Sequence, residues 1–209
     1  MTQGDSAGMP QFKEAVRANG DGMERGWRMW KRWSRRQGAA APEAARPAGA
    51  GPRVAPVVTL RPMTEAEYAG MRAYLDEGYA QDIARVMDLT IEEARAAGAK
   101  QIAELLKNGL ATEGHYLWKI IADQGDAVGD LWTLVDPGKR RAFIYFIGID
   151  EQSRGKGYGK AAMLALETAV RPKGADHIDL NVFGDNPTAI RLYEGLGYLP
   201  TAINMRKML

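Results

Sequence analysis

Hydrophobic and polar residues follow two different spacings along residues 57–209. Short runs of β-branched and aromatic residues, bounded by glycine, proline and aspartate, are typical of strands. They predict strands at Val57–Arg61, Tyr116–Ala122, Ala127–Val135, Ala142–Asp150 and His177–Phe183, with a final extended stretch to Leu209. Longer segments with helical periodicity predict helices at about 64–79, 90–108, 157–170 and 187–196.

Two of these helices carry an N-terminal signal. Thr64 and Thr90 each precede a glutamate by three residues, at Glu67 and Glu93, which is the capping-box pattern. The whole order reads β-α-α-β-β-β-α-β-α-β. It predicts an α/β (α+β) fold class, with helices packed on a mixed sheet.

Residues 1–55 differ in composition from the rest of the chain. Tryptophans alternate with arginines and lysines in residues 23–36, and residues 38–56 are dominated by alanine, proline and glycine. Residues 1–53 hold ten Lys and Arg against five Asp and Glu, whereas the whole chain carries a net charge of only +2. We expect a basic, flexible tail, although the Trp/Arg segment leaves a nucleic-acid or membrane contact open.

Composition excludes several kinds of site. The chain has no cysteine, which removes disulfides, thiolate metal sites and cysteine nucleophiles and suits a reducing cytoplasm. Only His115 and His177 offer imidazole, so we expect no multi-histidine metal site. No apolar stretch approaches the ~20 residues of a membrane span. The expected location is cytoplasmic, with no bound metal.

The most informative segment joins the strand at Ala142–Asp150 to the next helix. It contains three glycines and three basic residues, namely Arg154, Gly155, Lys156, Gly157, Gly159 and Lys160. Glycines permit positive φ and let backbone N–H groups converge on one point. The helix after the loop adds unpaired N–H donors and the positive end of its dipole. The segment therefore predicts a phosphate or pyrophosphate site.

Two other phosphate-binding loops fail on spacing. A P-loop needs Ser or Thr after Gly-Lys, but Ala161 follows Lys160, and Arg154 stands where the first glycine belongs. A dinucleotide fingerprint needs a third glycine where this chain has Lys160 or Ala162. ATP hydrolysis and NAD chemistry are therefore not expected.

At this loop the chain resembles the GNAT superfamily, whose cofactor motif is Arg/Gln-x-x-Gly-x-Gly/Ala. A second family signature, Asn-x-x-Ala, Leu-Tyr and Gly-Phe/Tyr, is matched by Asn186, Ala189, Leu192, Tyr193, Gly197 and Tyr198. The resemblance follows the element order of residues 57–209 and is sharp only between Ile147 and Tyr198. It implies a GNAT domain at residues 56–209, with a mostly antiparallel sheet of six to seven strands and about four helices.

The resemblance also implies how acetyl-CoA binds. The N–H groups from Gln152 to Lys160 would bind the CoA pyrophosphate, and the backbone of Ile147 and Ile149 would pair with the pantetheine arm like an added strand. A splay between the Ala142–Asp150 and His177–Phe183 strands would admit that arm. The implied binding residues are Ile147, Gly148, Ile149, Gln152, Arg154, Gly155, Lys156, Gly157, Tyr158, Gly159, Lys160, Asn186, Ala189 and Tyr193.

The implied reaction is direct attack of a primary amine on the thioester through a tetrahedral intermediate. Tyr193 would be the general acid that protonates the leaving thiolate. The strand before the loop lacks the carboxylate that many relatives carry. Asp179, His115, Tyr145 or a water chain remain candidates for the base, and Asn181 would orient an amine or a water.

The acceptor stays open between a small-molecule amine and a protein or peptide amine. Residues 79–115 would form its wall, where acidic residues would attract a cationic amine. The acids in or just before that segment are Asp76, Glu77, Asp82, Asp88, Glu92, Glu93 and Glu104. A homodimer is a further expectation. The alternative function is a non-catalytic acyl-CoA-binding or sensor domain.

Overall fold

The computed structural model describes residues 55–87, 89–203, 205 and 207, without the side chains of residues 78, 79, 81–83 and 85–87. The predicted tail with its Trp/Arg segment lies outside the described residues. By its contacts the chain divides into a unit of residues 52–192 and a unit of residues 1–51 with 193–209. The first unit contains the whole sheet.

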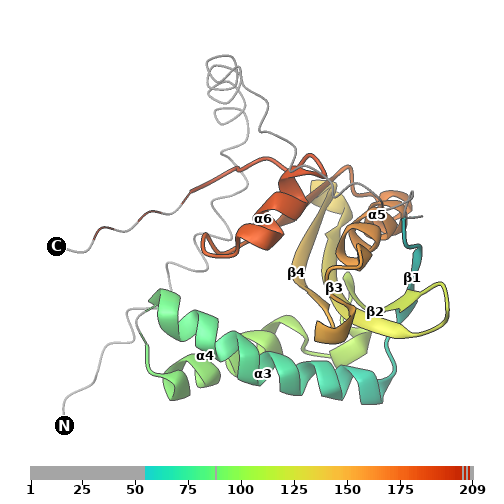
Figure 1. Cartoon of the computed structure of the whole chain (residues 1–209). Coiled ribbons are helices and arrows are strands. Elements are labelled where there is room, and N and C mark those ends of the chain that lie inside the picture. Colours follow the sequence, from blue (N-terminus) through green and yellow to red (C-terminus); the bar gives the residue numbers. More distant parts are fainter. Residues whose placement is uncertain (1–54, 88, 204, 206, 208–209) are drawn as a thin grey trace, which may run out of the picture. The chain divides into compact units, whose positions relative to one another are not determined.

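Five strands form one mixed sheet in the order β1-β2-β3-β4-β5 (Figure 1). They are β1 Val58–Pro62, β2 His115–Ala122, β3 Ala127–Asp136, β4 Arg141–Ile149 and β5 His177–Leu180. The first four strands are antiparallel, and β5 runs parallel to β4. The fold class is as predicted. Strands β4 and β5 are parallel because α5 crosses over between them, whereas β2, β3 and β4 are joined by turns and are antiparallel.

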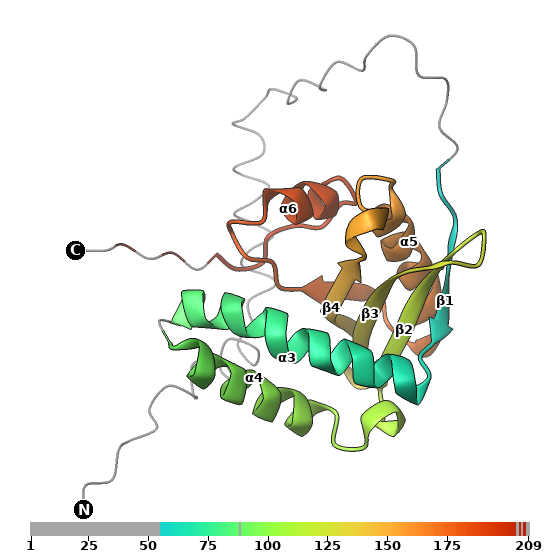
Figure 2. The ribbon, with the colours of Figure 1, turned by 60° about the horizontal axis from the view of Figure 1, so that its bottom comes forward.

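Among the described residues, four α-helices flank the sheet, namely α3 Glu65–Met87, α4 Ile91–Leu105, α5 Tyr158–Val170 and α6 Pro187–Glu194. Figures 1 and 2 show α3 and α4 side by side on one face of the sheet and α5 on the other. Among the described helices, none combines the length and apolar character that a membrane crossing requires. The described residues also contain no cluster of three or more His, Asp or Glu side chains suited to a metal ion.

Both predicted capping boxes are present. The Thr64 hydroxyl accepts the Glu67 N–H at 3.3 Å, and the Glu67 carboxylate accepts the Thr64 N–H at 2.8 Å. Thr90 and Glu93 make the same exchange. These bonds satisfy N–H groups that the first helical turn leaves free, so the sequence located both helix starts correctly.

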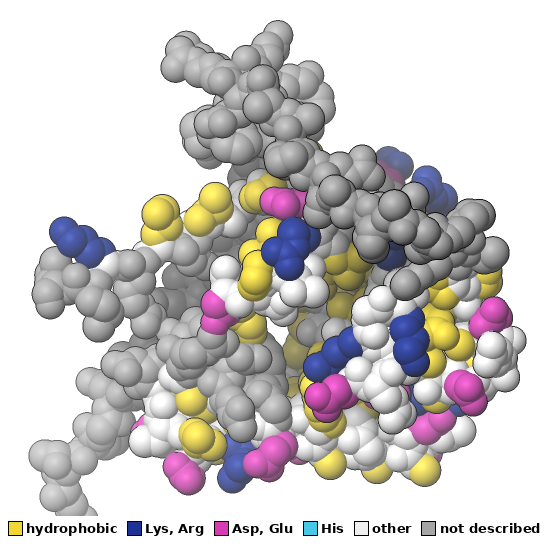
Figure 3. Space-filling view, viewed as in Figure 1, with side chains coloured by type: hydrophobic (Ala, Val, Ile, Leu, Met, Phe, Trp, Pro, Cys, Tyr) yellow, Lys and Arg dark blue, Asp and Glu magenta, His cyan; other side chains and the backbone are white. Residues whose placement is uncertain are grey.

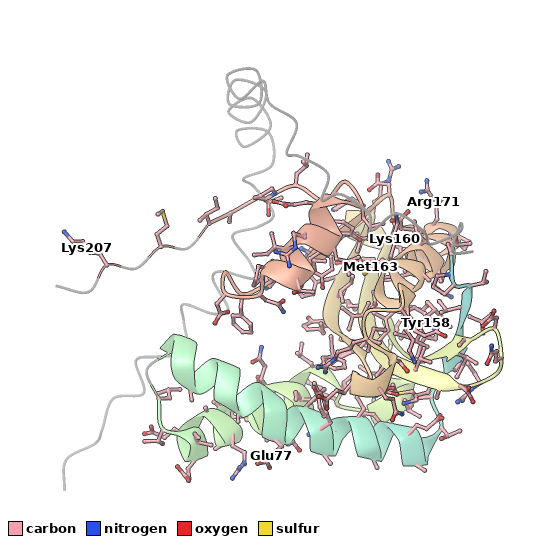
Figure 4. All side chains as sticks on the ribbon, viewed as in Figure 1. Glu77, Tyr158, Lys160, Met163, Arg171 and Lys207 are labelled. Atoms are coloured by element: carbon pink, nitrogen blue, oxygen red, sulfur yellow. The ribbon has the colours of Figure 1, made fainter. Side chains whose placement is uncertain are left out.

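Each face of the sheet carries its own apolar core. On the α3 and α4 side a buried cluster comprises Met63, Met71, Leu75, Ile102, Leu106, Leu117 and Trp132. On the other side α5 buries Ala162, Met163 (labelled in Figure 4), Leu166 and Val170. Helices thus cover both faces of the sheet. A ligand can therefore reach the sheet only at the ends and edges of its strands.

Three predicted boundaries were wrong. Helix α3 continues to Met87, past the predicted end near Tyr79, because Ala80 and Ala84 pack against α4 and its preceding residue Leu89. Strand β5 ends at Leu180 and not at Phe183. The stretch expected to extend to Leu209 forms no strand over its described residues, so the sheet has five strands there and not six to seven.

Candidate active site

Strand β4 carries one extra residue at the point where it pairs with Trp132 and Thr133 of β3. Trp132 of β3 lies opposite Phe146, and the next residue, Thr133, lies opposite Ile144, which leaves Tyr145 without a partner. This is a β-bulge. Tyr145 and Phe146 consequently both pack against the core cluster under α3 and α4, although successive residues of a regular strand face opposite sides.

The pairing between β4 and β5 ends at the bulge. Its last partners are Ile144 and Leu180, so residues 145–149 of β4 have no strand neighbour on that side within the described chain. The predicted parting of the two strands thus begins at Tyr145. An unpaired strand edge presents free N–H and C=O groups to an extended ligand.

The backbone groups that face this open edge can be assigned by alternation. The Asp150 N–H donates to Val128 at 2.9 Å, so it points toward β3. A Cβ built on Gly129 of β3 would collide with the carbonyl oxygen of Gly148, so that carbonyl points toward β3 as well. Successive backbone groups of a strand alternate in direction, and those of Ile147 and Ile149 therefore face the open edge.

The loop after β4 is held in a tight conformation. A 3-10 turn at Glu151–Ser153 leads to Gly155 and Gly157, whose φ angles are +73° and +91°. Glycine adopts such angles without the Cβ clash that other residues meet. The Nε of Arg154 donates to the carbonyl oxygen of Ile149 at 3.0 Å. The guanidinium thus ties the loop back to the last residue of β4.

The loop leaves a run of backbone donors without acceptors. Within the described residues, none of the N–H groups from Gly155 to Lys160 donates to a backbone or side-chain acceptor, and the first that does is Ala161, to Gly157 at 3.1 Å. Lys156 and Lys160 are exposed beside them. Figure 4 labels Tyr158 and Lys160 at this end of α5. Orphan N–H groups at a helix N-terminus with adjacent cations suit a phosphate group.

Charge elsewhere on the same view is mixed. Figure 3 shows basic and acidic side chains interspersed and not gathered into one large field of either sign. Attraction for an anion therefore arises locally, from the loop and the helix that it starts.

The model of the Acetyltransferase (GNAT) family matches residues 83–198 of this chain. The chain belongs to the GNAT family. It is 37% identical to the uncharacterized N-acetyltransferase YdgE of Bacillus subtilis over 153 residues, which are 72% of this chain and 98% of YdgE. It is 36% identical to YycN of the same organism over 73% of this chain and 99% of YycN. The crystal structure of YycN superimposes with a TM-score of 0.69 at 35% identity, covering 73% and 99% of the two chains.

Membership fixes the chemistry at the class level. This GNAT protein is an acetyl-CoA-dependent N-acetyltransferase, and acetyl-CoA is its co-substrate. The residues present fit that co-substrate in two respects. The unbonded N–H groups of residues 155–160 suit a pyrophosphate, and the open edge at Ile147 and Ile149 suits an amide-containing arm.

Two further predicted binding residues have contacts of their own. The Oδ1 of Asn186 accepts the Ala189 N–H at 3.0 Å, so this side chain caps α6, and its NH2 group remains available to a ligand. Gly159 faces Leu192 of α6, where a Cβ would lie 3.4 Å from the leucine side chain. The two family signatures of the GNAT domain thus meet directly at the start of α5.

His115 lies at the start of β2 and is half-buried. Its Nδ1 accepts the indole N–H of Trp132 at 2.9 Å. Burial lowers the pKa of His115. A neutral imidazole whose Nδ1 accepts must carry its proton on Nε2, so the lone pair that a base requires is already engaged.

Asp179 and Asn181 lie on or just beyond β5. The Oδ2 of Asp179 is 3.6 Å from Nη1 of Arg141, and both side chains are largely shielded from solvent. Asn181 is exposed just after the end of β5. His177 begins β5 and pairs with Asp176 at 2.6 Å.

Tyr193 is the seventh residue of α6 and belongs to the chain unit that contains residues 193–209. Its ring lies 5.8 Å from that of Tyr198, whose N–H donates to the Tyr193 carbonyl oxygen at 3.0 Å. Burial raises the pKa of Tyr193. The phenol therefore keeps its proton throughout the neutral range, as a general acid must.

Sequence reasoning missed the polar and aromatic residues of β3. Asp130 pairs with Lys119 at 2.6 Å and lies opposite Gly148, and burial raises the pKa of Asp130. Trp132 holds His115 and stacks on Tyr145 at 4.6 Å. Both partnerships join residues on neighbouring strands. No local spacing in the sequence signals them.

Proposed function

We propose that residues 56–209 catalyse acetyl transfer from acetyl-CoA to a primary amine, with the amine attacking the thioester directly. The observation that carries the proposal is the run of unbonded N–H groups from Gly155 to Lys160, next to the open edge of β4. Acetyl-CoA supplies the activated acyl group. The chain supplies binding, orientation and proton transfer.

In this proposal the loop binds the diphosphate through its main chain. Gly155 and Gly157 give the turn its shape, and Lys156 and Lys160 add charge from side chains that reach solvent. Arg154 stabilises the loop because its Nε donates to the Ile149 carbonyl oxygen. That bond fixes the loop relative to the strand along which the pantetheine arm would lie.

The open edge of β4 would orient the arm and the thioester. Ile147 offers both N–H and C=O there, whereas the carbonyl oxygen of Ile149 is taken by Arg154. The Ile147 N–H is the donor we assign to the developing oxyanion. Loss of one such donor costs about 3 kcal/mol in other acyl-transfer enzymes. The NH2 group of Asn186 would bind the arm from the other side.

In this proposal Tyr193 donates a proton to the leaving thiolate. On the amine, Nδ1 of His115 already accepts from Trp132, and the Asp179 carboxylate lies in an ion pair with Arg141. The chain therefore works chiefly by positioning an amine that arrives deprotonated, which can supply much of the rate enhancement. Asn181 is the residue we assign to orienting that amine or a water.

A matched pair of glycine variants tests the loop assignment. Gly157 and Gly125 share a φ of +91°, and Gly125 lies in the β2–β3 turn. Valine at either position meets the same backbone strain. Gly157→Val should raise the dissociation constant of CoA at least about tenfold by calorimetry, whereas Gly125→Val should leave it unchanged. Equal effects of the two variants would show that the loop does not bind CoA.

Release of free thiol from acetyl-CoA, followed with a panel of amines, tests the reaction itself. Turnover with at least one primary amine is the expected outcome. CoA binding without turnover on any amine would favour the acyl-CoA sensor, for which the engaged Nδ1 of His115 and the ion pair of Asp179 with Arg141 are the supporting observations.

A further inference from the structure

Five aromatic side chains lie on the α3 side of the sheet in two contacting groups, and Tyr145 and Phe146 pack on the same core cluster. Together they are here called the aromatic wall. They are Tyr74, His115, Trp132, Tyr145 and Phe146. Tyr145 stacks on Trp132 at 4.6 Å and on His115 at 5.7 Å, and Tyr74 of α3 lies 5.8 Å from Phe146. Trp132 is fully buried behind the others, Tyr145, Phe146 and His115 are half-buried, and Tyr74 is 58% exposed.

The wall stands where the pairing of β4 with β5 ends. Tyr145 is the bulged residue itself, and Phe146 is the next residue along the open edge. The bulge turns both side chains to the same face of the sheet, so two rings lie beside the segment assigned to the thioester. An acceptor that reaches the thioester from this face must pass the wall.

The charges near the wall do not favour a polycation. Three acidic residues of α3 and α4 have partners within the domain, since Asp76 pairs with Arg72, Glu77 with Arg95, and Glu93 caps its own helix. Glu77, labelled in Figure 4, points away from the sheet. Arg141 lies near the wall, because its guanidinium is 5.7 Å from the ring of Phe143, which contacts the ring of Tyr145 at 5.0 Å. The same guanidinium faces Asp179.

One polar group of the wall has a fixed orientation. Trp132 donates its indole N–H to Nδ1 of His115, which leaves Nε2–H as a donor with no acceptor among the described residues. Trp132 is thus a positioning residue for His115. The wall as a whole offers flat apolar surface with a few neutral polar groups, namely Nε2–H of His115 and the hydroxyl groups of Tyr74 and Tyr145.

We propose that the aromatic wall is the acceptor subsite and that it selects primary amines bearing an aromatic ring over aliphatic polyamines. The inference rests on the proposed acetyl transfer and names the acceptor class of that same site. A ring of the acceptor would stack against Tyr145 and Tyr74. Its amine would reach the edge of β4 at Ile147.

The test compares 2-phenylethylamine with spermidine on the full chain, by kcat/KM with acetyl-CoA at saturation. We expect 2-phenylethylamine to exceed spermidine by at least about tenfold. Tyr145→Leu and Tyr74→Leu should each lower kcat/KM for 2-phenylethylamine about two- to tenfold, the range of one aromatic contact. The KM for acetyl-CoA should not change. Tyr74 is exposed, so its variant cannot fail through loss of the core.

Tyr116→Leu is the matched control. Tyr116 is also half-buried and stacked, on Trp118 at 5.4 Å, but it adjoins His115 in β2 and so faces the opposite side, where Lys173 covers its ring at 4.4 Å. An equal loss in the control, or spermidine as the better substrate, would overturn the acceptor class and leave the acetyltransferase intact. If no amine turns over, binding of 2-phenylethylamine by calorimetry still decides the inference. Binding that Tyr145→Leu does not weaken would overturn it.

Discussion

Tyr193 is the side chain on which the proposed protonation of the thiolate depends. Because burial raises its pKa, its proton is available across the pH range of an ordinary assay. Its carbonyl oxygen accepts the N–H of Tyr198, a main-chain contact that no side-chain substitution removes.

Tyr193→Phe should therefore lower kcat about 10²-fold, the lower range for a general acid, with the CoA dissociation constant changed less than twofold. Single-turnover kinetics and calorimetry on the same preparation measure the two quantities. An unchanged kcat would show that Tyr193 is not the general acid and serves only in packing.

His115 makes the stability of the folded chain sensitive to acid. Its pKa is lowered by burial from an unfolded value of about 6.5. Below that value the unfolded state binds the proton more readily than the folded state does. The free energy of unfolding should thus be fully retained above about pH 6.5 and should fall as the pH drops through the folded pKa.

His115→Gln keeps an acceptor for the Trp132 N–H and removes this titration. Thermal unfolding from pH 5 to 8 should show a smaller loss of Tm on acidification for the variant than for the parent chain. His177 is present in both proteins, so its contribution to the pH dependence of Tm cancels in the comparison. Equal slopes would mean that His115 is not held neutral.

At the scale of the secondary-structure elements, the first turn of α5 carries a charge that destabilises the free helix. Lys160 lies in its first turn, where a positive charge meets the positive end of the helix dipole, and no acidic residue stands in that turn. The N-cap is Gly157, which makes no side-chain capping bond. A helix start of this kind is explained if an anion completes it.

Lys160→Gln should accordingly act in opposite directions on the free and the bound protein. We expect an unchanged or slightly higher Tm without ligand, and a CoA dissociation constant about two- to fivefold higher, the magnitude of one exposed ion pair. Lys139→Gln, an exposed lysine in the β3–β4 turn at the opposite end of β4, is the control for charge alone. A lower Tm with unchanged CoA affinity would contradict the phosphate role of α5.

At the scale of the whole molecule, one compact unit, residues 52–192, contains every residue of the sheet, the loop and the aromatic wall. Pro56 belongs to this unit and lies against the loop, since a Cβ on Gly157 would meet its ring at 3.2 Å. A functional domain should therefore begin between residues 52 and 56.

Removal of residues 1–51 should leave kcat/KM for acetyl transfer within about twofold of the full chain and preserve cooperative thermal unfolding. Salt-dependent retention on DNA, measured for both forms, tests a separate role for the basic tail. Retention that disappears with the tail would assign it a nucleic-acid contact. Loss of CoA binding on truncation would show instead that the acetyltransferase domain extends into the tail.

What the sequence determined by itself lies within short stretches of chain. The glycine turn between β4 and α5 could be predicted because its glycines and the start of the next helix are consecutive residues, and their backbone conformation needs no distant partner. The starts of α3 and α4 could be predicted for the same reason, since a capping box joins residues only three apart.

The tertiary structure decided everything that depends on how strands pair. It placed the bulge at Tyr145, ended β5 at Leu180, engaged His115 with Trp132 and set Arg141 against Asp179. Register across a sheet follows from the packing of both faces and from the turns, and a shift of one residue moves every side chain to the other face. The engagement of Nδ1 of His115 and the contacts among the rings at the bulge are therefore properties of the folded sheet.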